Sequence, residues 1–135
     1  MKRYLLDTGI MSDFINHRSG VDVRVRQAKQ QGIRIRTCMP VVGELFGGIE
    51  LSVTKEKNLK RLKAALARIV CWPFNRAAAE EFGLVYADLQ RRGRLIGPID
   101  MQIAAIALSL GDCTVVSKDT DFTSVTGLSV ENWAK

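Results

Sequence analysis

The sequence predicts an α/β fold, with a mostly parallel, twisted sheet of about five strands flanked by helices. Two observations predict this class. Short apolar segments suited to buried strands alternate with longer segments whose apolar residues recur at helical spacing, and Gly or Pro marks several of the junctions. The 135 residues contain no internal repeat or low-complexity linker, which predicts one domain over residues 1–135.

The N-terminal third predicts two strands and two helices. Residues 4–6 form an apolar run that ends at Asp7, as in a buried strand that meets a turn. Helices are expected over 10–16 and 21–31. Residues 33–38 alternate apolar and basic side chains, which is the period of a strand with one solvated face.

The rest of the chain continues this alternation. Pro40 suits the first position of a helix that carries Val41, Leu45 and Ile49 on one side, and Pro98 starts a later helix in the same way. The further elements expected are helices over 54–68, 76–92 and 98–110, and strands over 69–73, 113–117 and 128–130.

Charge and cysteine content narrow the function classes. Twenty Lys and Arg against fourteen Asp and Glu leave a net charge of +6, which favours an anionic partner such as nucleic acid. Cys38, Cys71 and Cys113 are scattered and are expected to pack as small hydrophobes. No signal peptide or membrane-spanning stretch is apparent, so a cytoplasmic protein without membrane contact is expected.

Four acids fall where a parallel sheet binds its ligands, outside the carboxyl ends of the strands. Asp7 ends the first strand, and Asp119 follows the strand over 113–117 by two residues. Asp100 lies in the first turn of the helix before that strand, and Glu44 lies one turn into the helix after the second strand. We expect all four to converge on one edge of the sheet.

Gathered carboxylates raise one another's pKa unless a cation neutralises them. An all-oxygen site selects a hard ion, so Mg²⁺ is expected, with Mn²⁺ as a plausible substitute. Such an ion polarises a phosphate oxygen and lowers the pKa of a bound water, and a second ion can stabilise the leaving oxygen. The predicted chemistry is hydrolysis of a phosphodiester.

Each acid also has an ordinary explanation. Asp100 suits the dipole of its helix, and Asp7 suits a turn. Asp119 and Asp121 suit a loop or a cap. Glu44 is surrounded by apolar residues and is expected to face inward, where an unpaired carboxylate would be costly.

Other functional groups are sparse. The single histidine, His17, has no evident triad partners, and no glycine-rich phosphate loop occurs. Trp72 and Tyr86 suit core positions.

These segments resemble the PIN-domain ribonucleases, and in particular the VapC toxins of bacterial toxin–antitoxin pairs. The resemblance covers the whole chain and is carried by Tyr4-Leu5-Leu6-Asp7-Thr8, Val41-Val42-Gly43-Glu44-Leu45, Gly97-Pro98-Ile99-Asp100, Val115-Val116-Ser117-Lys118-Asp119 and Leu128 to Trp133.

The resemblance implies a magnesium-dependent endoribonuclease that cuts structured RNA, often tRNA. It implies a homodimer and a VapB-like antitoxin. Asp7, Glu44, Asp100 and Asp119 would be the catalytic, metal-binding residues, with Thr8 and Ser117 in support. Asp121 competes with Asp119 for the outer position. The chain departs from the family at Gly9, where Asn is usual.

Three other kinds of protein compete with this interpretation. A basic nucleic-acid-binding module would use the same surface charge, and its acids would be structural. A receiver-like phosphotransfer domain would need an acceptor Asp at the end of its middle strand, but the chain has Trp72-Pro73-Phe74 there. A dehalogenase-like phosphatase would need a second Asp at the position of Gly9.

Overall fold

The computed structural model describes residues 2–135 and contains a five-stranded sheet in the order β3-β2-β1-β4-β5. Every described strand pair is parallel, which confirms the predicted class. The strand expected over 69–73 is shorter than predicted and contributes only two residues. The strand expected over 128–130 is shifted and extends to Glu131. The strands are β1 (Arg3–Leu6), β2 (Arg34–Cys38), β3 (Cys71–Trp72), β4 (Cys113–Val116) and β5 (Ser129–Glu131).

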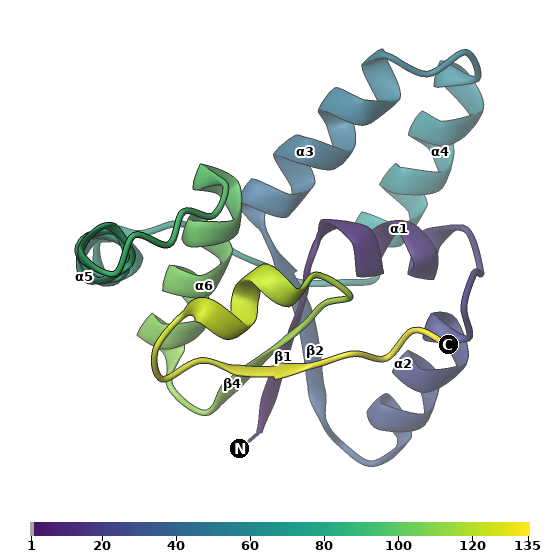
Figure 1. Ribbon diagram of the computed structural model, residues 1–135. Coiled ribbons are helices and arrows are strands. Elements are labelled where there is room, and N and C mark those ends of the chain that lie inside the picture. The colour runs from purple at the N-terminus through teal and green to yellow at the C-terminus, as the bar shows by residue number, and fades with distance from the viewer. Residues whose placement is uncertain (1) are drawn as a thin grey trace.

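The predicted helices are also present, and they cover both faces of the sheet. Figure 1 shows α1 and α2 on one side of the strands and α5 and α6 on the other, while α3 and α4 form a hairpin that projects beyond the end at which β1 finishes. A short 3₁₀ helix, η1 (Thr120–Ser124), was not predicted. The α-helices are α1 (Thr8–Ile15), α2 (Val21–Gln30), α3 (Met39–Glu50), α4 (Lys55–Leu66), α5 (Arg76–Arg91) and α6 (Pro98–Leu110).

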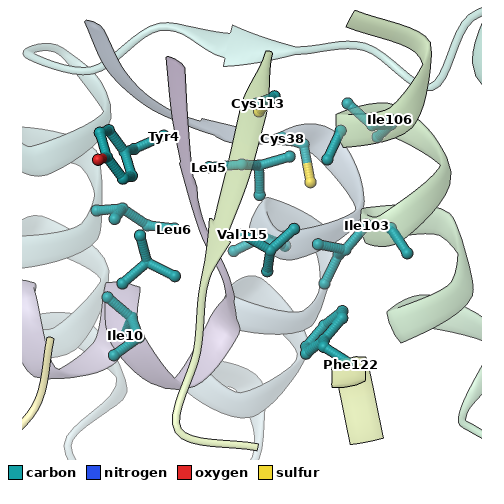
Figure 2. Packing of buried hydrophobic residues seen from close by; sticks show 14 of the residues in the cluster. Tyr4, Leu5, Leu6, Ile10, Cys38, Ile103, Ile106, Cys113, Val115 and Phe122 are labelled. Carbon is teal, nitrogen blue, oxygen red and sulfur yellow. The ribbon is translucent and has the colours of Figure 1, made fainter. Parts of the chain in front are cut away.

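The central strands are apolar on both faces because helices bury both faces. Leu5 and Leu6 are fully buried although they point to opposite sides of β1. Leu5 and Val115 face Ile103 of α6, while Tyr4 lies on the other side of β1 (Figure 2). This core holds β1 and β4 rigidly in the middle of the sheet.

The strand order reverses between β1 and β4, which makes their carboxyl ends the expected ligand-binding crevice of such a sheet. Leu6 pairs with Val116 in parallel register, and the Asp7 amide extends the ladder by donating to the Val116 carbonyl at 3.1 Å. The next residues of the two strands, Asp7 and Ser117, therefore emerge side by side.

The three cysteines are free thiols, and Cys38 and Cys113 are buried, as predicted. Burial raises the pKa of both thiols to about 12, so they stay protonated and unreactive at neutral pH. Among the described residues, no helix is both long and apolar enough to cross a bilayer.

One prediction concerns Phe122, the fully buried residue by which η1 is anchored to the core near Ile103 (Figure 2). Phe122→Ala should lower the free energy of unfolding by about 3–5 kcal/mol because it leaves a cavity. Urea denaturation would measure this loss. Leu51→Ala, at a side chain that is 90% exposed, is the control and should change stability by less than about 0.5 kcal/mol. Equal effects of the two changes would contradict the assigned packing.

Candidate functional site

Asp7 is the buried centre of the candidate site and the N-cap of α1. Its residue is 7% exposed, and its Oδ1 accepts a hydrogen bond from the Ile10 amide at 2.9 Å. Burial is the main reason why the pKa of Asp7 is raised, although its hydrogen bonds oppose the shift. Asp7 is therefore a helix cap, where a turn residue was the ordinary explanation, and the cap uses only one carboxylate oxygen.

Ser117 connects Asp7 to the loop that follows β4. Its hydroxyl donates to Asp7 Oδ2 and accepts from the Asp119 amide at 2.9 Å. The serine is 3% exposed, so this geometry is shielded from water. Ser117 thus orients the first acid and fixes the direction of the loop that carries the last one.

Asp100, Asp119 and Asp121 form a cluster at the same edge of the sheet. Each offers a carboxylate oxygen that lies within 4.8 Å of the other two. Asp119 also caps η1, because its Oδ1 accepts from the Asp121 amide at 2.8 Å. Asp119 is therefore both a cap and a member of the cluster. Asp119 and Asp121, the two candidates for the outer ligand, both lie close to Asp100.

The charge of this cluster acts strongly on Asp100. Its pKa is raised to about 6, first by desolvation and then by the negative charges of Asp119, Glu44, Asp7 and Asp121. The predicted convergence of the four acids is confirmed by these mutual interactions. A helix-dipole role alone would lower the pKa of Asp100, so desolvation together with the nearby acids outweighs it.

Glu44 corrects one expectation, because its side chain is exposed and does not face inward. Val41 and Val42 are the buried residues of α3, and beyond them the helix projects past the body of the protein (Figure 1). Glu44 nevertheless reaches the site, where Thr8 Oγ1 donates to its Oε1. Thr8 is thus placed to support the site by orienting Glu44.

Gly9 does not distort the start of α1. A Cβ at this position would meet its nearest neighbours, Asp7 Oδ1 and Lys118 Cε, at 3.8 Å each, which is ordinary contact. The bracing of Asp7 comes instead from Ser117 and the Ile10 amide.

Asp13 is a neighbour of the site that sequence reasoning missed, and so is its contact with Lys118. Asp13 is 4% exposed, and its Oδ2 lies 2.7 Å from Lys118 Nζ. The polar Ser12-Asp13 pair in the otherwise apolar segment Ile10–Ile15 was the available signal. It does not identify a partner that lies 105 residues away.

A groove of about 430 Å³ continues from the site between α1, α3 and α4. It begins at Thr8, Gly9 and Glu44, and Arg18 and Arg61 also line it. The groove therefore meets the site at Glu44, and two arginines lie along it.

The donor set fits a hard divalent cation. All five carboxylates are oxygen ligands, which Mg²⁺ and Mn²⁺ prefer. After desolvation, the negative charges of the neighbouring acids are the causes that raise the pKa of Asp100. A cation bound at Asp100, Asp119 and Asp121 would relieve that repulsion.

Comparison with known proteins identifies the family. Residues 4–128 match the family described as PIN domain. The chain belongs to the PIN-domain family. Within it, the chain is 35% identical to the tRNA(fMet)-specific endonuclease VapC of Shigella flexneri, over 99% of this chain and 100% of the relative. It is 33% identical to ribonuclease VapC2 of Haemophilus influenzae, over 98% of this chain and 99% of the relative. These similarities place it among the VapC proteins of that family.

Solved VapC structures share the fold described above. VapBC2 from Rickettsia felis, bound to a DNA fragment from their promoter, matches with a TM-score of 0.90 and 27% identity, over 97% of this chain and 98% of that one. DNA-bound VapBC from Salmonella typhimurium also matches with a TM-score of 0.90 and 27% identity, over 99% of this chain and 100% of that one. The α3–α4 hairpin and the sheet order are thus those of a PIN domain.

The raised pKa of Asp100 predicts how the metal-free PIN domain responds to pH. Its pKa is about 6 in the folded protein against 3.8 for an ordinary Asp carboxyl, so the folded state holds this proton more tightly. Stability should therefore fall as pH rises from about 4 through 6 and then level off. Asp100→Asn should flatten that part of the profile and stabilise the protein at pH 7. Thermal unfolding in EDTA would measure both profiles, and parallel profiles would contradict the prediction.

Proposed function

We propose that this chain is a magnesium-dependent endoribonuclease, with Mn²⁺ as an effective substitute, and the toxin of a toxin–antitoxin pair that acts in the cytoplasm. The observation that carries the proposal is the convergence of Asp7, Glu44, Asp100 and Asp119 at the switch point of the sheet. The names of the VapC relatives, which include an endonuclease specific for tRNA(fMet), support RNA as the substrate. Structured RNA such as tRNA is the substrate class proposed for this chain.

The surroundings of each acid indicate which role it would have in the reaction. Asp7 and Asp100 would hold the cation at the carboxyl ends of β1 and β4, with Asp119 or Asp121 in the outer position. Asp100, Asp119 and Asp121 offer carboxylate oxygens within 4.8 Å of one another. A bound Mg²⁺ polarises a phosphate oxygen and lowers the pKa of a coordinated water. Ser117 keeps Asp7 oriented by its hydrogen bond, so that the carboxylate needs little reorganisation when the site loads.

Glu44 and Thr8 would act on the solvent side of the site. Thr8 fixes one carboxylate oxygen of Glu44, and the exposure of this glutamate places its charge where water and substrate arrive. A positioned carboxylate can orient an attacking water and accept its proton. The net charge of +6 supplies long-range attraction for the RNA, which offsets the local repulsion of the acids.

The proposed partners are a VapB-like antitoxin and a second copy of this chain. The structural neighbours from Rickettsia felis and Salmonella typhimurium are VapBC complexes, which supports the first. A homodimer is supported by the apolar surface around α5, where Leu84, Tyr86 and Leu95 are 67%, 50% and 79% exposed. Tyr86 is therefore a surface residue and not the core residue that its spacing predicts. Trp72, in contrast, is 9% exposed and belongs to the core, as expected.

Cleavage assays with Asp7→Asn and Asp100→Asn test the central proposal. Each change should abolish magnesium-dependent cleavage of host RNA, since it removes a charged ligand but preserves side-chain size. RNA binding should survive both changes. Gel analysis of total RNA would measure cleavage, and sequencing of the new ends would locate the bonds cut. If wild type with magnesium cuts no host RNA and both variants behave identically, the chain is a non-catalytic nucleic-acid-binding module instead.

Asp119 and Asp121 can be separated by metal titration. The Asp119 carboxylate accepts a hydrogen bond from the Asp121 amide, and the Asp119 amide donates one to the Ser117 hydroxyl. Asp119 is therefore the better-positioned ligand. Asp119→Asn should weaken Mn²⁺ binding by a larger factor than Asp121→Asn, as measured by calorimetry. A larger loss for Asp121→Asn would assign the outer position to that residue.

A further inference from the structure

The ion cluster that Asp13 of α1 forms with Lys118 and Arg18 is not explained by the metal site. Asp13 has a side chain that is only 6% exposed, and it contacts two cations: Lys118 Nζ at 2.7 Å and Arg18 Nε at 3.4 Å. Each carboxylate oxygen has its own partner, because Lys118 contacts Oδ2 and Arg18 contacts Oδ1. A buried carboxylate needs such compensation, but one carboxylate with two cations leaves one positive charge in excess.

Lys118 carries that excess charge to the edge of the candidate site. Its backbone lies between Ser117 and Asp119, which are both parts of the site. Its Cε lies 3.8 Å from the point where a Cβ of Gly9 would stand, and Asp7 Oδ1 lies at the same distance from that point. The lysine side chain thus passes Gly9 in the first turn of α1 and ends at Asp13.

The ammonium group remains available to a ligand. The Lys118 side chain is 46% exposed although its Nζ is held by Asp13. An ammonium has three donors, and the contact with Asp13 uses one of them. Gly9 has no side chain to cover the lysine stem. The result is a cation fixed in direction and open to solvent beside a cluster of acids.

The chemistry of the site requires a cation at this place. Five carboxylates with one divalent cation still carry a net negative charge, which repels an approaching phosphodiester. A preorganised positive group beside the acids would offset this repulsion and orient the strand.

We propose that Lys118 binds an RNA phosphate next to the one that is cleaved, and that buried Asp13 is the positioning residue that holds its ammonium group there. This inference rests on the proposed ribonuclease function for the identity of the ligand. Arg18 also neutralises the charge of Asp13. The charge of Lys118 is therefore not fully cancelled by its own ion pair with Asp13.

Metal-free RNA binding is the first test, because it does not depend on cleavage. The probe is a short, fluorescein-labelled single-stranded RNA titrated in EDTA, with affinity read from anisotropy at several salt concentrations. Lys118→Ala should weaken binding about tenfold and reduce the salt slope by close to one phosphate contact. Lys118→Arg should retain most of the affinity, because it keeps the charge.

A matched control separates a local contact from net charge. Lys29 is exposed near the end of α2, before β2 begins, and hence at the opposite edge of the sheet from the acids. Lys29→Ala removes the same charge and should leave both affinity and salt slope close to wild type. Equal losses for Lys29→Ala and Lys118→Ala, equal losses for the Arg and Ala variants at 118, or wild-type binding by Lys118→Ala would each overturn the proposal.

Steady-state cleavage then tests the positioning role of Asp13. Asp13→Asn removes a negative charge, so simple electrostatics predicts no loss of RNA affinity. A misplaced ammonium should instead lower kcat about tenfold with little change in KM. Lys118→Ala should raise KM as well as lower kcat. If Asp13→Asn stays folded and keeps the wild-type kcat, Asp13 does not position the lysine. If wild type itself cleaves no RNA, the proposed function fails, while the binding measurement still decides the role of Lys118.

Discussion

The parallel pairing of β1 with β4 is the constraint on which the site depends. It places Asp7 and Ser117 at adjacent strand ends, so a buried carboxylate immediately meets a buried hydroxyl. The Ser117 hydroxyl in turn accepts a hydrogen bond from the Asp119 amide, and the Asp119 carboxylate accepts one from the Asp121 amide. One backbone register therefore sets the direction of an entire hydrogen-bonded series that leads from the core to the outer acids.

The electrostatic character of this edge is unfavourable in the protein alone. Desolvation and neighbouring carboxylates raise the pKa of Asp100 to about 6, which is the opposite of what a stabilising surface charge shows. Natural proteins tolerate such local cost at functional sites because the surrounding core holds the groups in place. Here that support comes from buried residues on both faces of β1 and β4 and from Phe122, which is fully buried beneath the loop acids.

Much of this arrangement is predictable from the sequence, for identifiable reasons. Apolar periodicity locates the elements, and the rule that ligands bind at strand ends brings Asp7, Asp100 and Asp119 together. Glu44 shows where such reasoning stops. Its apolar neighbours suggest an inward side chain, but α3 leaves the body after Val42, and only the tertiary arrangement reveals this.

The pairing of Asp13 with Lys118 could not be predicted, because it depends on two segments 105 residues apart. Periodicity and strand-end rules describe segments one at a time and do not report how side chains meet across the fold. Tyr86 is a milder case, since helical spacing marks the apolar side of α5 but not how much of that side the neighbouring α6 covers.

The lengths of the outer strands have a separate consequence. β3 contributes two residues and β5 three, so each border of the sheet offers few unpaired backbone groups to another chain. Growth of the sheet across two molecules is therefore a poor route to assembly. Association between copies through side-chain contacts is therefore favoured, and its specificity would depend on the shape of those side chains and not on backbone complementarity.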